Sequence, residues 1–208
     1  MKIGGFHPAS FNNYPGRVAA VVFTQGCNFR CPYCHNSQLI SCNRSTRLDE
    51  QYILSRLAAR KGKLAGVVIS GGEPTLQDDL RFFCHRIREL GYPVKVDTNG
   101  SRPAVLAELL SDMVVDCIAM DIKAPLQQYA QLAGVAVDTE AIRQSIVLIA
   151  GSGVPHLFRT TFVESLLSAG DLEEIRKLVP IGSPYTVQQF KEVMMPRGQG
   201  LAAGHQTR

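Results

Sequence analysis

Three cysteines within eight residues constrain this chain more than any other feature. Cys27, Cys31 and Cys34 stand at C-x3-C-x2-C spacing, in a loop that Gly26 opens after the apolar run of residues 18–23. Thiolates are soft ligands that suit zinc ions and iron–sulfur clusters. The spacing alone therefore predicts a metal centre, and it favours an iron–sulfur cluster over a zinc ion.

The number of available ligands sharpens this prediction. A structural zinc site closes with four Cys or His ligands, and an ordinary [4Fe–4S] cluster uses four cysteines. The loop supplies three cysteines, and His35 and Cys42 are the candidates for a fourth ligand. With three cysteines, one iron keeps an open coordination position, which indicates chemistry at the metal. With Cys42 as a ligand the centre would be closed and ferredoxin-like, so this alternative stays open. We expect Cys84 and Cys117 to be buried as small hydrophobic residues.

The length of 208 residues fits one well-packed domain. We expect this domain to cover residues 1–195, with an arm or short hairpin over residues 1–17 and a polar tail over residues 196–208. The sequence has no apolar run long enough to span a membrane and no apolar signal core, so we expect a cytoplasmic protein without a membrane partner. The net charge of +4 includes a basic cluster at residues 56–63, which a solvated helix face explains better than nucleic-acid binding.

Apolar runs alternate with amphipathic segments along the chain. Strands are predicted over residues 18–24, 64–69, 94–97, 114–121, 156–163 and 185–190. Helices are predicted over residues 48–60, 76–90, 139–150 and 172–178, with a short helix that Ser101 caps and that has Pro103 in its first turn. Six strands that alternate with helices predict an α/β fold with a parallel sheet covered by helices. The periodicity fits an open sheet and a partial barrel equally well.

Each predicted strand ends in polar or flexible residues. These ends are residues 24–25, 70–74, 97–100, 121–123, 159–161 and 188–189. Because the carboxyl ends of parallel strands meet on one rim, they predict a single large site there. Lys123 and Arg159 are candidate partners for the carboxylates of Asp97 and Asp121, and strand alternation places Lys95 on the same face as Asp97.

Two motifs resemble those of the radical S-adenosylmethionine superfamily. The cysteine motif at residues 27–34, with Tyr33 before its last cysteine, resembles the signature of that superfamily, and Gly-Gly-Glu-Pro at residues 71–74 resembles its second motif. Residues 4–6, 14–16, 24–36, 97–100, 121–123 and 159–161 further resemble the glycyl-radical-enzyme activases. The resemblance extends from about residue 3 to residue 190. Within that group the sequence is most similar to the activating proteins of anaerobic ribonucleoside-triphosphate reductase.

This resemblance implies an activity. The three cysteines would hold a [4Fe–4S] cluster, and S-adenosylmethionine would bind its open iron. An electron from the reduced cluster would cleave S-adenosylmethionine to a 5′-deoxyadenosyl radical, which takes a hydrogen atom from a glycine of a partner enzyme. The protein would then be an oxidoreductase that activates a glycyl-radical enzyme, with anaerobic ribonucleotide reductase as the first candidate. A reduced flavodoxin or ferredoxin-type protein would donate the electron.

The resemblance also implies a fold and residue roles. It implies a partial (β/α)6 barrel of parallel strands with outer helices. It assigns cofactor binding to Tyr33, Gly71, Gly72, Glu73, Pro74, Asp97, Thr98, Asn99, Asp121, Lys123 and Arg159. Glu73 would face the methionyl ammonium group, and Lys123, with Arg159, the carboxylate. Asp97 and Asp121 would bind ribose, the ammonium group or a monovalent cation. The two glycines would let the backbone approach the ligand.

Other functions remain open at this stage. The chain departs from the family at Asn13, where an acidic residue often precedes Tyr-Pro-Gly, and its end offers only Gln189 as an adenine contact. One alternative is a radical enzyme that acts on another glycyl-radical enzyme, a peptide or a small molecule. Another is a non-catalytic iron–sulfur or zinc module for electron transfer or interaction. The polar strand ends argue against the last, because a simple electron carrier needs no such pocket.

Overall fold

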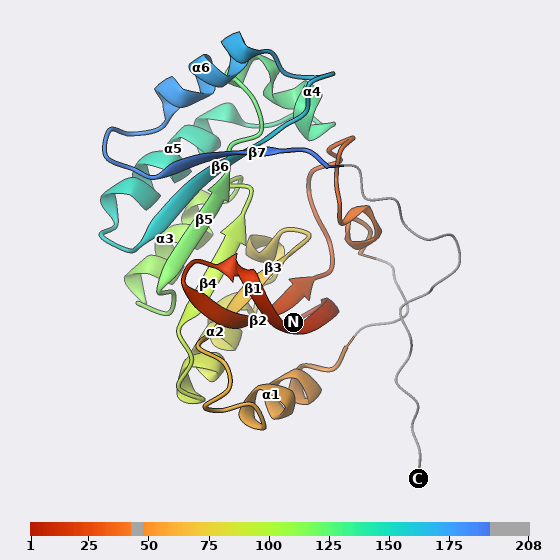
Figure 1. The fold of residues 1–208 in the computed structure, drawn as a ribbon, viewed down its shortest axis with the longest axis vertical. Helices are drawn as coiled ribbons and strands as arrows, with labels where there is room; N and C mark the ends of the chain where they lie inside the picture. The colour runs from red at the N-terminus through yellow and green to blue at the C-terminus, as the bar shows by residue number, and fades with distance from the viewer. Residues whose placement is uncertain (43–47, 192–208) are drawn as a thin grey trace.

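Seven strands form one sheet in the order of the sequence. The computed structural model describes residues 1–42 and 48–191. The strands are β1 (Ile3–Tyr14), β2 (Arg17–Thr24), β3 (Gly66–Gly71), β4 (Val94–Thr98), β5 (Cys117–Asp121), β6 (His156–Phe162) and β7 (Tyr185–Gln189). Strands β2 to β7 are parallel, and β1 lies antiparallel to β2 at one edge (Figure 1). The six predicted strands are therefore all present, and the N-terminal arm adds a seventh.

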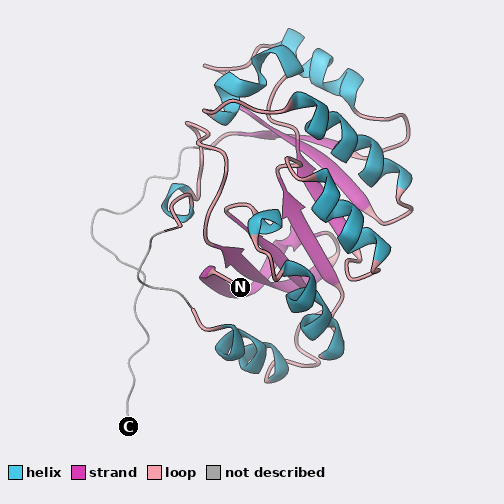
Figure 2. Ribbon diagram, turned by 180° about the vertical axis from the view of Figure 1, so that it is seen from behind, coloured by secondary structure: helices cyan, strands magenta, loops and turns pink. Residues whose placement is uncertain are grey.

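The connections between parallel strands carry the helices. These are α1 (Glu50–Ala58), α2 (Leu80–Glu89), α3 (Pro103–Ser111), α4 (Tyr129–Ala133), α5 (Thr139–Gly151) and α6 (Ala169–Leu178), with short 3₁₀ turns η1 (Ser37–Leu39), η2 (Pro74–Leu76) and η3 (Leu126–Gln128). Figure 2 shows the helices along one side of the strands. The predicted cap of α3 is wrong, because Arg102 holds the N-cap position. Ser101 instead accepts a hydrogen bond from Asn28 Nδ2 at 2.8 Å.

Strand β1 is longer than the sequence indicated. The sequence indicated only a short apolar piece near its start, within an arm or short hairpin. In the structure β1 spans 12 residues and pairs with β2 around a turn at residues 15–16, where Gly16 has φ +69°. The pairing contains register shifts, and most of its residues are partly or fully exposed. Its first residue, Ile3, pairs with Thr24 at the carboxyl end of β2, whereas Tyr14 pairs with Arg17 at the start of β2.

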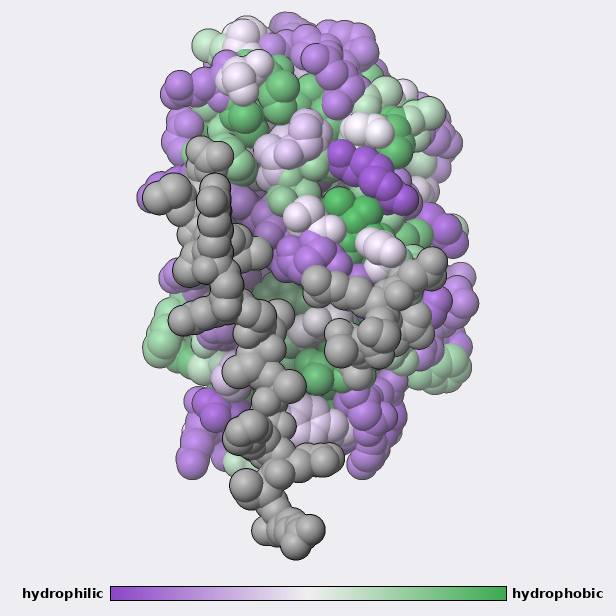
Figure 3. Space-filling view, turned by 90° about the vertical axis from the view of Figure 1, so that its right-hand side faces the viewer, coloured by the Kyte–Doolittle hydropathy of each residue, from purple (hydrophilic) through white to green (hydrophobic). Residues whose placement is uncertain are grey.

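The two faces of the sheet differ in how many apolar side chains they bury. The main core lies between the sheet and the helices and includes Cys84, which is fully buried as predicted. The opposite, inner face holds a small apolar group, here called the floor cluster: Tyr14, Ala19, Val21, Val68 and Cys117. Polar side chains follow it toward the strand ends. None of the helices in the described ranges is both long and apolar enough to cross a membrane. The face shown in Figure 3 mixes hydrophilic and hydrophobic residues over its described part.

Candidate functional site

A cavity of about 380 Å³ lies at the carboxyl ends of the parallel strands. Its lining includes Cys27, Cys31, Tyr33, Cys34, Gly71, Gly72, Glu73, Asp97, Thr98, Asn99, Asp121, Lys123 and Arg159. These are all the site residues predicted from the sequence except Pro74, which lies buried as the first residue of η2. The structure therefore brings the predicted residues together on one rim.

The three cysteines of the motif are half-buried around this cavity. Burial raises the pKa of the Cys27 thiol to about 11 and also raises the pKa of Cys31. The thiolate rather than the thiol is the metal ligand, so a bound metal has to displace these protons. Cys27 and Cys31 therefore favour the neutral thiol until a metal is bound.

This donor set fits a cluster better than a single metal ion. Across residues 1–42 and 48–191, no three His, Cys, Asp or Glu side chains converge closely enough to hold one metal ion. In an iron–sulfur cluster, by contrast, the cysteines bind different iron atoms, so their sulfurs stand further apart. Three thiols around one cavity meet that requirement. Cys42 is not among the lining residues of the cavity, but its Sγ lies beside Gly26 at the start of the cysteine loop, 2.7 Å from a Cβ added there.

The cysteine loop is held from both sides. Gly26, at φ +103°, donates its N–H to Leu39 O at 2.7 Å, and Arg30 N donates to Ala133 O at 2.7 Å. Gly134 follows α4, and a Cβ there would lie 2.3 Å from Arg30 O. The loop backbone therefore packs directly on the end of α4. This contact fixes its path before any metal is bound.

The Gly-Gly-Glu-Pro turn at residues 71–74 binds the start of the same loop through backbone hydrogen bonds. Gly72 N donates to Thr24 O at 3.0 Å, and Glu73 N donates to Gly26 O at 2.8 Å. A Cβ on Gly72 would lie 2.1 Å from Gly26 O, and one on Gly71 would lie 2.4 Å from Thr24 N. The two glycines thus allow the turn to lie against the base of the cysteine loop. Their close approach to a ligand stays a prediction.

Glu73 ties the ends of β3 and β4 together. Its Oε1 accepts hydrogen bonds from Thr75 N at 3.1 Å, Thr75 Oγ1 at 2.6 Å and Thr98 Oγ1 at 2.7 Å. Its Oε2 accepts from Asn99 N at 2.7 Å. Burial raises the pKa of Glu73, and these donors oppose that effect. The Glu73 carboxylate thus stabilises contacts within the protein. Its contact with the ammonium group of a ligand stays a prediction.

Hydrogen bonds between side-chain amides connect Asn99, whose N–H binds Glu73, to Asn28 of the cysteine loop. Asn99 Nδ2 donates to Asn28 Oδ1 at 2.9 Å, and Asn28 Nδ2 donates to Ser101 Oγ. Ser101 N in turn donates to Asn99 Oδ1 at 3.0 Å. Asn28 lies between the first two cysteines of the motif, and its hydrogen bonds were not predicted from the sequence. We call Asn28, Glu73, Thr75, Thr98, Asn99 and Ser101 the hydrogen-bond network.

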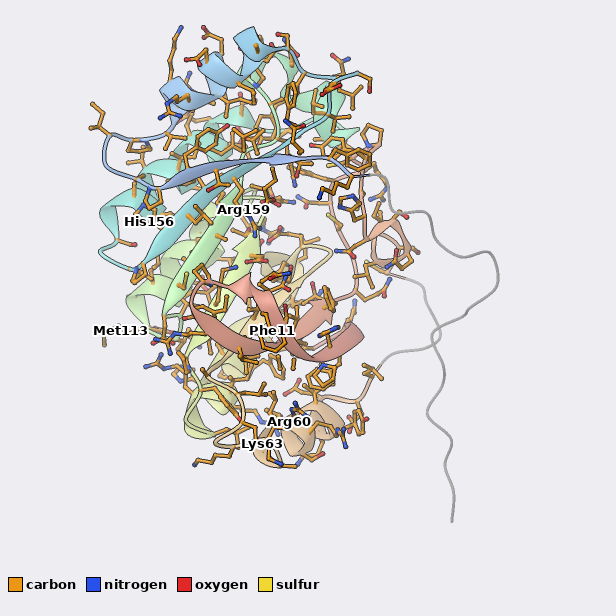
Figure 4. All side chains as sticks on the ribbon, in the orientation of Figure 1. Phe11, Arg60, Lys63, Met113, His156 and Arg159 are labelled. Atoms are coloured by element: carbon orange, nitrogen blue, oxygen red, sulfur yellow. The ribbon has the colours of Figure 1, made fainter. Side chains whose placement is uncertain are left out.

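A second group on the inner face consists of alternating charges. Lys95 contacts Asp97, Arg159 NH1 lies 3.6 Å from Asp97 Oδ2, and Arg159 Nε donates to Asp121 Oδ1 at 2.8 Å. Lys123 Nζ donates to Asp121 Oδ2 at 3.0 Å. Burial acts to raise the pKa of Asp121, but the charges of Lys123 and Arg159 hold it well below its usual value. We call these five residues the charge ladder. In Figure 4, Arg159 lies between β1 and β7.

Aromatic rings close the side of the cysteine loop that faces β7. Phe190 stacks on His35, with centroids 4.9 Å apart, and meets Tyr33 edge-on at 6.3 Å. His35 Nε2 lies 2.9 Å from Lys191 O. Burial raises the pKa of Tyr33 to about 12, and its hydroxyl has no hydrogen-bond partner among the described residues. His35 therefore contacts the end of β7 and lines the cavity without adding to a single-ion site.

Some cavity residues were missed in the sequence. Asn12 and Asn13 reach the cavity from β1, and Asn36 reaches it from the cysteine loop. Gln188 lines the cavity from β7, whereas its neighbour Gln189 was the predicted adenine contact. The only signal for the first pair was the departure from the family pattern at Asn13. Finding them requires the long-range pairing of β1.

Comparison with protein families decides between the interpretations. A family model described as the Radical SAM superfamily matches residues 21–179. The chain belongs to the Radical SAM superfamily. The superfamily assignment confirms the predicted cofactors, a [4Fe–4S] cluster and S-adenosylmethionine, and the predicted class of radical-generating oxidoreductase. The non-catalytic iron–sulfur or zinc module is thereby set aside.

Two relatives cover this chain to different extents. A Methanocaldococcus jannaschii protein, provisionally named a glycyl-radical enzyme activating enzyme, is 36% identical over 196 residues, 91% of this chain and 80% of that protein. The pyruvate formate-lyase-activating enzyme of Clostridium pasteurianum is 32% identical over 114 residues, 52% of this chain and 47% of that enzyme. The chain thus spans most of the first relative and about half of the second.

A solved structure shares the fold of this Radical SAM protein. The structure of anSMEcpe with bound AdoMet has a TM-score of 0.62 and 17% sequence identity, and the match covers 81% of this chain and 49% of that one. At this identity the likeness shows the fold alone. It confirms the predicted α/β architecture, with a mostly parallel sheet curved as a partial barrel.

Proposed function

We propose that this protein is an activase that generates a glycyl radical on a partner enzyme. The observation that carries the proposal is the similarity to the M. jannaschii relative over 91% of the chain. The cavity supports it, since its lining includes the three cysteines and four residues of the charge ladder, Asp97, Asp121, Lys123 and Arg159. When bound, the reduced cluster supplies the electron that cleaves S-adenosylmethionine.

The residues around the cavity have distinct tasks in this proposal. Cys27, Cys31 and Cys34 hold the cluster. Lys123 lines the cavity, with its side chain 15% exposed, and binds the carboxylate of S-adenosylmethionine together with Arg159. The remaining predicted cofactor contacts are those of Tyr33, Gly71, Gly72, Glu73, Pro74, Asp97, Thr98, Asn99 and Asp121. Exclusion of water by these walls protects the reactive species.

Anaerobic ribonucleoside-triphosphate reductase is the partner that we favour. The stretches that resemble its activating proteins lie on the cavity: residues 27–34, 97–99, 121–123 and 159–161 contribute most of its lining. We further propose a reduced flavodoxin or ferredoxin-type protein as electron donor. The cavity lining includes Asn12 and Asn13 of β1 and Gln188 of β7, and a glycine-bearing loop of the partner would enter between these two strands.

The test is a reconstitution under anaerobic conditions. Holoenzyme is mixed with S-adenosylmethionine, a strong reductant and candidate glycyl-radical enzymes, and the glycyl radical is detected by electron paramagnetic resonance. We expect the signal with the anaerobic reductase, its loss in Cys31→Ala, and its retention in Cys42→Ala. If 5′-deoxyadenosine forms but no candidate acquires a radical, the substrate is a peptide or small molecule instead. If a fully loaded cluster forms no 5′-deoxyadenosine, the proposal is wrong.

A further inference from the structure

The inner face of β4 carries a buried lysine that the proposed function does not use. Lys95 is 1% exposed, although lysine is among the residues least often buried. It lies in register with Val68 on β3 and Cys117 on β5, beside the floor cluster. Its ammonium group contacts the Asp97 carboxylate. Because a buried charge is costly unless it is paired, this lysine calls for a specific role.

Lys95 is the inner end of the charge ladder. The ladder contains three cations, Lys95, Arg159 and Lys123, and two carboxylates, Asp97 and Asp121, so it carries one positive charge in excess. Each carboxylate oxygen already has a partner. On Asp97, Oδ1 faces Lys95, and Oδ2 faces Arg159 as well as the Ser70 hydroxyl at 3.2 Å. On Asp121, Oδ1 faces Arg159 and Oδ2 faces Lys123.

This arrangement does not fit the free monovalent cation that the family resemblance implied at Asp97 and Asp121. Such a cation would add charge to a network that is already positive. It would also share carboxylate oxygens that already face Lys95, Arg159 or Lys123. The position next to Asp97 is therefore filled by the chain itself.

We propose that Lys95 is a tethered cation that positions Asp97 beneath the cavity, so that S-adenosylmethionine binds without a free monovalent cation. Lys95 acts through a series of ion pairs that the structure contains: Asp97 with Arg159, Arg159 with Asp121, and Asp121 with Lys123. Lys95 itself lies outside the cavity lining, so it is a positioning residue. The proposal concerns cofactor binding alone and needs no partner enzyme.

The test measures the affinity of reconstituted holoenzyme for S-adenosylmethionine by anaerobic equilibrium dialysis. Sodium, potassium, ammonium or tetramethylammonium is the only monovalent cation in each of four buffers of equal ionic strength. We expect wild-type protein to bind equally in all four buffers, within about twofold. We expect Lys95→Met to bind at least about tenfold more weakly in tetramethylammonium, which is too large to enter, and to recover in buffers with a small cation.

Two controls keep the result interpretable. Lys63→Met removes an exposed lysine beside α1, which lies far from Arg159 in the view of Figure 4, and should match wild type in every buffer. Iron content and thermal unfolding show whether Lys95→Met is folded and loaded. A wild-type affinity that falls in tetramethylammonium overturns the proposal whatever the variant does. So does a loaded Lys95→Met that binds as wild type does. Neither outcome bears on whether a glycyl radical is formed, so failure here is distinct from failure of the proposed function.

Discussion

The hydrogen-bond network and the charge ladder meet at β4 but hold the pocket in different ways. Strand alternation sends Asp97 to the inner face and its neighbour Thr98 toward Glu73, so adjacent residues serve separate networks. The hydrogen-bond network uses one carboxylate, backbone N–H groups, hydroxyls and amides at fixed short distances. The charge ladder uses long side chains that reach across β4, β5 and β6.

This difference separates two tasks. The hydrogen-bond network and the glycine turn act on the backbone of the cysteine loop, so they determine where the three thiols stand. The charge ladder acts on side chains that face the cavity, so it determines how the cavity receives a charged ligand. Substitutions in the hydrogen-bond network or the glycine turn should therefore reduce cluster loading. Substitutions in the charge ladder should reduce affinity for S-adenosylmethionine.

The largest effect is expected from Gly72→Ala. The added Cβ would lie 2.1 Å from Gly26 O, a backbone atom that cannot rotate away. The cysteine loop has to shift, at a cost of about 1–3 kcal/mol in the free energy of unfolding, and most bound iron should be lost. Iron analysis after reconstitution and denaturant unfolding measure both quantities. Gly151→Ala, at the end of α5 with open space around it, is the matched control and should load normally. Full iron content in Gly72→Ala would contradict the supporting role of the turn.

An intermediate effect is expected from Lys123→Met. This change removes the outer cation of the charge ladder but keeps the length of the side chain, and the hydrogen bond that it breaks is to Asp121 and not to the cysteine loop. We expect affinity for S-adenosylmethionine to fall about tenfold, or about 1.4 kcal/mol, with unchanged iron content. Anaerobic binding measurements test this. Lys177→Met, which breaks an exposed pair with Glu174, should change neither quantity. Loss of iron in Lys123→Met would show that the two networks are not separate.

Local sequence predicted the site because its residue types follow the strands directly. The polar ends of β3, β4, β5 and β6 are short stretches whose convergence follows from a parallel sheet alone. Partners that lie far apart in the chain were harder to predict. Ser101 was expected to cap α3, but its hydroxyl binds Asn28, 73 residues away. Lys123 and Arg159 were correctly expected to pair with the carboxylates, whereas the contact of Lys95 with Asp97 was visible only as a shared strand face.

Strand β1 shows the same limit for the fold. Its sequence mixes Gly, Pro and Asn with apolar residues, which weakens the period-two pattern of a strand. Its pairing with β2 contains register shifts, so no regular alternation marks which residues face the sheet. The segment was therefore predicted as an arm or short hairpin and not as a 12-residue strand, and Asn12 and Asn13 were missed with it. The polar tail predicted from residue 196 lies outside the described residues.

The smallest effect is expected from a change at Phe190, where the end of β7 contacts the cysteine loop. Phe190 follows β7 and packs on His35 and Tyr33 of the cysteine loop, so it joins the strands near the charge ladder to the loop that the hydrogen-bond network holds. Phe190→Leu keeps an apolar side chain but removes both ring contacts, which are worth about 0.5–1.5 kcal/mol each. Since the backbone contacts of the loop remain, the cluster should still load, but it should lose iron to a chelator a few times faster. Phe11→Leu, at a ring that is 77% exposed on β1, is the control and should release iron at the wild-type rate. If Phe190→Leu also releases iron at that rate, the loop is held by its backbone contacts alone and the separation between the two networks is complete.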